Sequence, residues 1–172
     1  MNFKVEDHDI GRDYSCFDSS VGIAFRGTRF GSVDFMDPEY AAQLFRLRAH
    51  TGVQGIVQMY SAFTHKVISL GDSKSIVERA DKSVFTTAEP CDGLVVPADV
   101  NLTTLQTNGD CPTILLHRPD GEIANLHGGL RCLENGDNTS IIEEAVKLMV
   151  QDKFMVQDLR AFVLAGANKC CF

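Results

Sequence analysis

Apolar residues recur at helical spacing in two segments of the chain. The first segment begins at Asp37–Glu39, where Asp37 can cap free N–H groups and Pro38 suits the first helical position. The apolar face of this helix is formed by Tyr40, Leu44 and Leu47. The second segment opens with Ser140–Glu143, which has the spacing of a capping box. We therefore expect one helix up to His50, ended by Gly52, and another after Ser140.

Between these helices the pattern changes to short apolar runs that are separated by turn residues. The runs are Gly55–Tyr60, Lys66–Leu70, Gly93–Val96, Leu102–Thr107, Thr113–His117 and Ile123–His127, and two more are Val21–Phe25 and Leu159–Leu164. The central runs follow one another without room for helical crossovers. The pattern predicts an α+β fold with mixed β-sheets flanked by helices, in preference to a doubly wound sheet.

Composition narrows the class of protein. The length of 172 residues, without a repeat or a linker, predicts a single domain over residues 1–172. A formal charge of −7 argues against nucleic acid or an anionic membrane as partners, because both are bound through basic surfaces. The N-terminus has no secretory pattern and no apolar run is long enough to span a bilayer, so we expect a cytoplasmic protein. In a reducing compartment the six cysteines would be free thiols or metal ligands.

A predicted hairpin brings one cysteine and one histidine together. Arg118–Gly121 is a turn signal between two apolar runs. If the strands pair about Pro119, Cys111 lies directly opposite His127. Opposed side chains have Cβ atoms about 4.5 to 5.5 Å apart, so a thiolate and an imidazole there could bind one metal ion.

A catalytic zinc ion usually takes three protein ligands, so a third residue is required. His8 lies in a polar tail that we expect to be mobile, His50 ends a helix, and His117 adjoins the turn. His65 remains, at the start of an apolar run. The residues alone leave a second interpretation open, in which Cys111 is a small buried hydrophobic residue and the histidines are only hydrogen-bonded.

Four segments of the chain occur in the order of known family motifs. They are Phe63–His65, Thr107–Leu116, His127–Cys132 and Leu164–Phe172. These segments resemble the motifs Gln-x-His, Thr-x-Asp-Cys-x-Pro-x-Leu-Leu, His-Ala-Gly-Trp-Arg-Gly and a Gly-rich end in Cys-Cys-Tyr. Phe25–Gly31 is similar to an N-terminal Thr-Arg-x-Gly turn. The motifs are those of the laccase-domain proteins, also called multicopper polyphenol oxidase-like proteins, purine nucleoside phosphorylases of that type or peptidoglycan-editing factor.

The chain also departs from these motifs. Leu130 replaces the family tryptophan, Cys132 replaces the glycine that follows the arginine, and Phe63 stands where Gln-x-His has glutamine. The alanine before the Asp-Cys pair is also missing. Relatives continue beyond the position of Phe172, so we expect the family's C-terminal part to be absent. These departures concern the substrate pocket more than the metal ligands.

The resemblance implies the layered α/β/β/α laccase-domain fold and a zinc ion held by His65, Cys111 and His127, with one open position. It implies a zinc-dependent purine nucleoside phosphorylase or adenosine deaminase, with adenosine, inosine or methylthioadenosine as the substrate. Zinc lowers the pKa of bound water towards ~7 or polarises a substrate. Copper is disfavoured, because multicopper oxidation needs several copper centres and the chain has five histidines.

Further residues have roles that the resemblance implies. Arg131 would be a catalytic residue together with the three metal ligands. Either Arg131 or Arg29 would bind phosphate, and for both the alternative is an ordinary ion pair. Asp110 would orient a neighbouring group or contact substrate, or else only stabilise the turn at Asn108–Gly109. Cys170–Cys171 is not expected to bind metal.

Two other functions stay open at this stage. One is hydrolysis of an amide in a peptidoglycan precursor, and the other is a non-catalytic metal-binding protein of the same fold. In the enzymatic interpretations the partner is a small molecule, a purine nucleoside with phosphate, and a homo-oligomer is left open.

Overall fold

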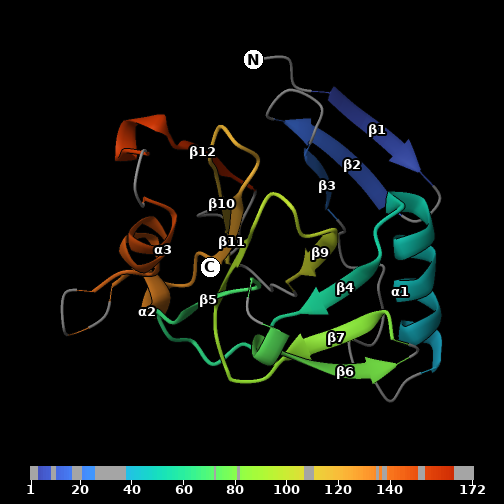
Figure 1. The fold of residues 1–172 in the computed structure, drawn as a ribbon. Coiled ribbons are helices and arrows are strands. Elements are labelled where there is room, and N and C mark those ends of the chain that lie inside the picture. Colours follow the sequence, from blue (N-terminus) through green and yellow to red (C-terminus); the bar gives the residue numbers. More distant parts are fainter. Residues whose placement is uncertain are drawn as a thin grey trace, which may run out of the picture. The chain divides into compact units, whose positions relative to one another are not determined.

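The computed structural model describes residues 4–8, 11–16, 21–25, 38–71, 73–80, 82–106, 111–134, 136, 139–150 and 154–164. The chain forms two compact units, Met1–Gln54 and Gly55–Phe172. Figure 1 shows the helices and strands of both units. The expectation of a single domain over residues 1–172 stays a prediction.

The N-terminal unit contains a three-stranded antiparallel sheet and one helix. The sheet has the order β1 (Lys4–His8), β2 (Gly11–Cys16) and β3 (Val21–Phe25). Strand β3 matches its predicted run, whereas β1 and β2 were missed because they are rich in polar residues. His8 does not lie in a mobile tail: it ends β1 and pairs with Gly11, because the two polar strands form a hairpin.

Helix α1 (Pro38–Thr51) confirms the first predicted helix. It ends as the sequence indicates, because Gly52 adopts a φ of +68° and its N–H donates to the carbonyl of Arg48 at 2.9 Å. A residue with a Cβ is disfavoured in this left-handed conformation.

The C-terminal unit contains two mixed sheets. The five-stranded sheet has the order β12 (Arg160–Val163), β10 (Thr113–His117), β11 (Ile123–His127), β8 (Gly93–Val96) and β5 (Val67–Ser69). The four-stranded sheet has the order β6 (Ile76–Ala80), β7 (Val84–Thr87), β4 (Gly55–Gln58) and β9 (Leu102–Leu105). Strand β8 is parallel to β5, and β4 is parallel to both β7 and β9, while the other pairs are antiparallel. The predicted α+β fold with mixed sheets is confirmed.

Helices cover one face of the five-stranded sheet. Helix α3 (Ile141–Met149) packs on β8, β11 and β5, and the short helix α2 (Leu130–Leu133) packs on α3. The predicted capping box is present: the N–H of Glu143 donates to Ser140 Oγ at 3.2 Å, and the N–H of Ser140 donates to the Glu143 carboxylate at 3.1 Å. An apolar cluster that includes Val57 and Leu94 lies between the two sheets and joins them. Within this unit the layers are therefore α, β and β.

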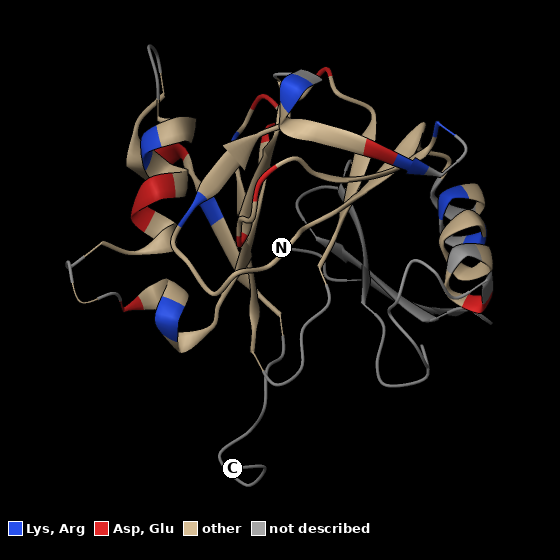
Figure 2. Cartoon of the chain, turned by 90° about the horizontal axis from the view of Figure 1, so that it is seen from below, with Lys and Arg blue, Asp and Glu red and all other residues tan. Residues whose placement is uncertain are grey.

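Charges of both signs lie side by side on α3. Glu144 forms an ion pair with Lys147 at 2.6 Å, and Figure 2 shows acidic and basic segments next to one another on this helix. The acidic residues occupy the first turn and Lys147 the last, which complements the helix dipole. Among the helices that the structure describes, none is long and apolar enough to cross a membrane.

The hairpin of β10 and β11 differs from the predicted register by two positions. Thr113, and not Cys111, lies opposite His127, and His117 lies opposite Ile123. The turn is centred one residue later than expected, because the Arg118 N–H donates to the Glu122 carbonyl at 2.8 Å and Gly121 adopts a φ of +102°. A shift of two positions keeps residues on the same face of a sheet. The expected direct opposition of Cys111 and His127 is wrong, but both stay on one side of the hairpin.

Candidate metal centre

The ladder between β8 and β11 places Asp92 beside His127. Gly93 pairs with Leu126, and one step further the His127 N–H donates to the Asp92 carbonyl at 2.8 Å. The two side chains also meet, with His127 Nδ1 at 2.9 Å from Asp92 Oδ1. Both residues are buried, with exposed fractions of 4% for His127 and 0% for Asp92. The sheet therefore fixes one nitrogen of the imidazole against a carboxylate.

The Asp92 carboxylate receives further hydrogen bonds from the segment that precedes β5. Ser61 Oγ donates to Oδ1 at 2.5 Å, and the backbone N–H groups of Ala62 and Thr64 donate to Oδ2 at 3.1 and 2.8 Å. Burial raises the pKa of Asp92, but the hydrogen bonds from His127, Ser61, Thr64 and Ala62 together outweigh it and hold the pKa below its usual value. Asp92 is therefore a carboxylate that only accepts hydrogen bonds.

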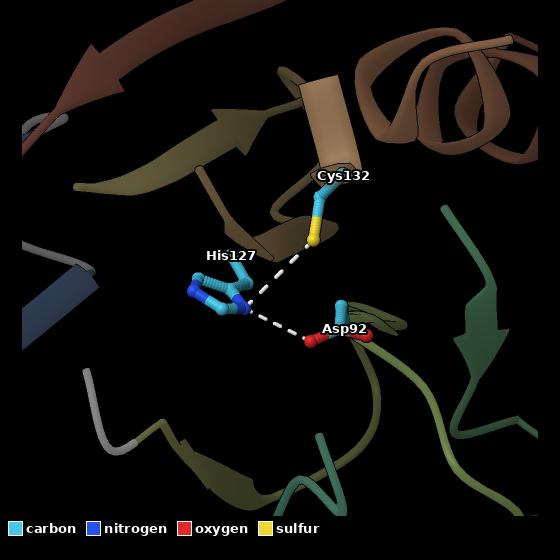
Figure 3. A group of neighbouring side chains, drawn as sticks. All are labelled: Asp92, His127 and Cys132. Atoms are coloured by element: carbon cyan, nitrogen blue, oxygen red, sulfur yellow. Dashed lines mark hydrogen bonds and ion pairs between the residues drawn. The ribbon is translucent and has the colours of Figure 1, made fainter. Parts of the chain in front are cut away.

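This pairing determines the tautomer of His127. Because the Asp92 carboxylate can only accept, His127 Nδ1 carries the proton and donates it. In the neutral imidazole the lone pair is then on Nε2. In Figure 3 this second nitrogen lies on the side of the ring away from Asp92 and Cys132.

Cys132 adjoins the same histidine from helix α2. Its Sγ is 3.9 Å from His127 Nδ1, and the side chain is fully buried. Burial raises the pKa of this thiol to about 12, with smaller contributions from the negative charges of Asp92 and Cys111. The ligand atoms of Asp92, His127 and Cys132 lie within 4.8 Å of one another, so these residues form a candidate metal-binding triad (Figure 3).

The other side of the imidazole faces Cys111 across Gly129. A Cβ added at Gly129 would lie 3.1 Å from His127 Nε2 and 3.5 Å from Cys111 Sγ. The two atoms therefore border the same small space, which a side chain at residue 129 would fill. An imidazole nitrogen and a thiolate are the ligands that zinc prefers. Cys111 and His127 are therefore the two residues that offer such ligand atoms at this space.

The predicted ligand His65 lies three residues after Ala62, in the segment that Asp92 holds. It is half-buried, just before β5. Among the residues that the structure describes, the one group of three ligand atoms within 4.8 Å of one another contains neither His65 nor Cys111. The structure thus brings Cys111 to His127 at Gly129, and the complete set of His65, Cys111 and His127 stays a prediction.

The remaining predicted residues have different positions. Arg131 is exposed on α2, two residues after Gly129. Arg29 and Asp110 lie outside the described residues, as do Cys170 and Cys171.

Sequence reasoning missed Asp92 and Cys132 as neighbours of His127. The sequence shows only that Asp92 is an acidic residue directly before the apolar run Gly93–Val96. This position does not indicate which residue Asp92 contacts. Cys132 stood out only because it replaces the family glycine.

Comparison with known proteins places the chain in a family. The family model described as multi-copper polyphenol oxidoreductase laccase matches residues 39–172. The chain belongs to this family. The resemblance inferred from the motifs is thereby confirmed for a stretch that includes α1 except its first residue, Pro38, and all residues of the candidate metal centre. No curated protein is significantly similar to this laccase-family chain.

Three solved structures share the fold of this family member. The hypothetical protein YfiH from Bacillus licheniformis has 17% identity and a TM-score of 0.59, covering 78% of this chain and 49% of that one. YlmD from Geobacillus stearothermophilus has 17% identity and a TM-score of 0.61, covering 85% and 52%. Protein NMB0706 from Neisseria meningitidis has 15% identity and a TM-score of 0.56, covering 95% and 62%. The laccase-family chain thus matches about half to three fifths of each of these longer chains.

Proposed function

We propose that this chain is a zinc-dependent enzyme that acts on purine nucleosides, by phosphorolysis or by removal of an amino group from the purine ring. Membership of the laccase family supports a metal-dependent enzyme. The observation that carries the proposal is the state of His127, whose Nδ1 donates to Asp92 while its Nε2 shares the space over Gly129 with Cys111 Sγ. A histidine held in this way by a carboxylate is the usual arrangement of a zinc ligand.

In this proposal the ligands are His65, Cys111 and His127. Zinc supplies a Lewis acid that lowers the pKa of water towards ~7 and polarises substrate oxygens. Asp92 holds the tautomer and orientation of His127, and its hydrogen bond from the Thr64 N–H fixes the residue before His65. The protein thus uses one buried carboxylate to position two of the three proposed ligands.

The Nδ1 side of the ring is a less suitable place for the metal. A metal ion there would have to replace the proton that His127 donates to Asp92. It would also take its sulfur ligand from Cys132, whose side chain is fully buried. We therefore favour the Nε2 side, where Cys111 is half-buried and thus reached by solvent.

The substrate residues are part of the same proposal. Arg131 is exposed two residues beyond Gly129, where a guanidinium could bind phosphate through two parallel hydrogen bonds. Arg29 and Asp110 are proposed as further substrate contacts on the family resemblance alone.

Two cysteine variants test the metal site. We expect wild-type protein purified without chelators to contain about one zinc per chain, since such ions survive purification. Cys111→Ser should lose most of this zinc, whereas Cys132→Ser, an equally small change on the other side of His127, should retain it. The measurement is elemental analysis of the folded proteins.

The activity test uses adenosine and inosine, each with and without phosphate. Release of the base that requires phosphate indicates phosphorolysis, and conversion of adenosine to inosine without phosphate indicates deamination. Zinc below about 0.2 per chain in the wild type would contradict the proposal. Full zinc content with no product from either nucleoside would instead favour a non-catalytic metal-binding protein.

A further inference from the structure

Phe63 has an unusual backbone conformation. Its φ is +56°, in the left-handed region that bulky residues rarely adopt. Such a conformation is unfavourable by itself and persists only where the surroundings impose it.

The surroundings of Phe63 explain its conformation. The N–H groups of its two neighbours, Ala62 and Thr64, both donate to Oδ2 of Asp92. Ser61 Oγ donates to the other oxygen of the same carboxylate. Because the backbone on both sides of Phe63 is bound to one buried group, the chain must turn sharply at this residue. The carboxylate that orients His127 therefore also fixes the backbone at Phe63.

The side chain of Phe63 lies beside the candidate metal centre and yet is open to solvent. Its ring centroid is 5.6 Å from that of His127, with the two planes inclined at 56°. Even so, 57% of the residue is exposed. A second apolar side chain, Leu130, is 74% exposed directly after Gly129. Phe63 thus contributes exposed apolar surface beside His127, and Leu130 contributes it next to Gly129 in the sequence. Sites that bind small molecules combine apolar surface with a few polar groups in this way.

We propose that Phe63 is a specificity-determining residue, on whose ring a planar ring of the ligand stacks. Aromatic side chains stack on nucleobases without needing a particular pattern of hydrogen bonds. A purine base is the ligand ring that this proposal predicts, so the inference deepens the proposed function and rests on it. Phe63 stands where the family motif has glutamine, so this contact is a feature of this chain.

The test measures the binding of adenosine by calorimetry to the wild type, Phe63→Leu and Phe63→Tyr. Loss of the aromatic ring should weaken binding about ten-fold or more, since stacking on one base contributes on that scale. Phe63→Tyr keeps the ring and should bind within about three-fold of the wild type. Nuclear Overhauser contacts between adenine H8 and the Phe63 ring should be present in the wild-type complex.

Phe154→Leu is the matched control. Phe154 is another phenylalanine, half-buried, whose ring lies 4.5 Å from the Arg118 guanidinium carbon, at the turn end of the hairpin and not at the His127 end. This variant should bind adenosine as the wild type does. Zinc content should be the same in all four proteins, because Phe63 is proposed to contact the ligand and not to support the metal.

The outcomes separate this inference from the proposed function. Equal affinity of the wild type and Phe63→Leu for adenosine would overturn the role of Phe63 and leave the proposed function standing. Loss of zinc in Phe63→Leu would also overturn it, by showing a structural role. Adenosine binding that depends on Phe63, without any turnover of the nucleoside, would support the role of Phe63 and contradict the proposed enzymatic activity. A wild type that binds no adenosine would overturn both.

Discussion

At the scale of single residues, Asp92 determines what its neighbours can do. Its two oxygens accept hydrogen bonds from His127, Ser61, Ala62 and Thr64. One carboxylate thereby fixes the tautomer of a histidine and the shape of the segment before His65. Removal of such a buried acceptor leaves several donors without a partner, which costs about 1–3 kcal/mol for each.

Asp92→Asn is the conservative change that isolates the charge of this residue. An amide cannot accept the His127 proton with the strength of a carboxylate, so the orientation of the imidazole is weakened. We expect zinc affinity to fall about 10- to 100-fold, as for other carboxylates that support a metal-binding histidine. Competition with a zinc-binding dye measures this affinity.

The matched control for this variant is Asp120→Asn. Asp120 accepts two hydrogen bonds of 2.8 Å from Arg118 at the hairpin turn and has no part in the metal centre. The zinc affinity of the Asp120→Asn variant should equal that of the wild type. Wild-type affinity in Asp92→Asn as well would show that the carboxylate does not support the metal ligand.

The sequence allowed prediction of Cys111 and His127 as neighbours but not of Asp92. The turn at Arg118–Gly121 limits how two adjacent strands can pair, so a local signal was enough to bring the cysteine near the histidine. Asp92 is 35 residues away from His127 and meets it only because β8 pairs with β11. No local pattern states which strand lies next to which, and so this partner required the structure.

At the scale of helices and strands, prediction succeeded where apolar periodicity was strong. Strands β8, β10 and β11 have the bounds of their predicted runs, and α3 begins directly after Ser140, the first residue of the predicted capping box. Strands β6 and β7 were missed, because Glu78 and Arg79 interrupt the first and the second is only four residues long. The hairpin register was wrong by two positions because Gly121, with its positive φ, extends the turn beyond Pro119.

The capping box of α3 gives a prediction at this scale. Ser140→Ala removes the acceptor for the Glu143 N–H, so the free energy of unfolding should fall by about 1 kcal/mol. Ser140→Gly should cost only a few tenths of a kcal/mol, or about a third of that loss, because glycine is tolerated as an N-cap. Urea denaturation measures both. Equal stability of the wild type and Ser140→Ala would contradict the role of the cap.

At the scale of the whole molecule, the candidate metal centre belongs to one compact unit. Its described members run from Ser61 to Cys132, within Gly55–Phe172. The proposed ligands therefore all belong to this unit, in which His127 ends β11 of the five-stranded sheet. The family match spans this unit and α1, whereas the similar solved structures are longer chains.

The position of the metal tests this account most directly. Crystals of the zinc-loaded protein, measured at the zinc absorption edge, would give an anomalous peak that marks the ion. The expected peak lies about 2.0 Å from His127 Nε2 and about 2.3 Å from Cys111 Sγ, with His65 as the third ligand. A peak on the Nδ1 side, bonded to Asp92 and Cys132, would contradict it.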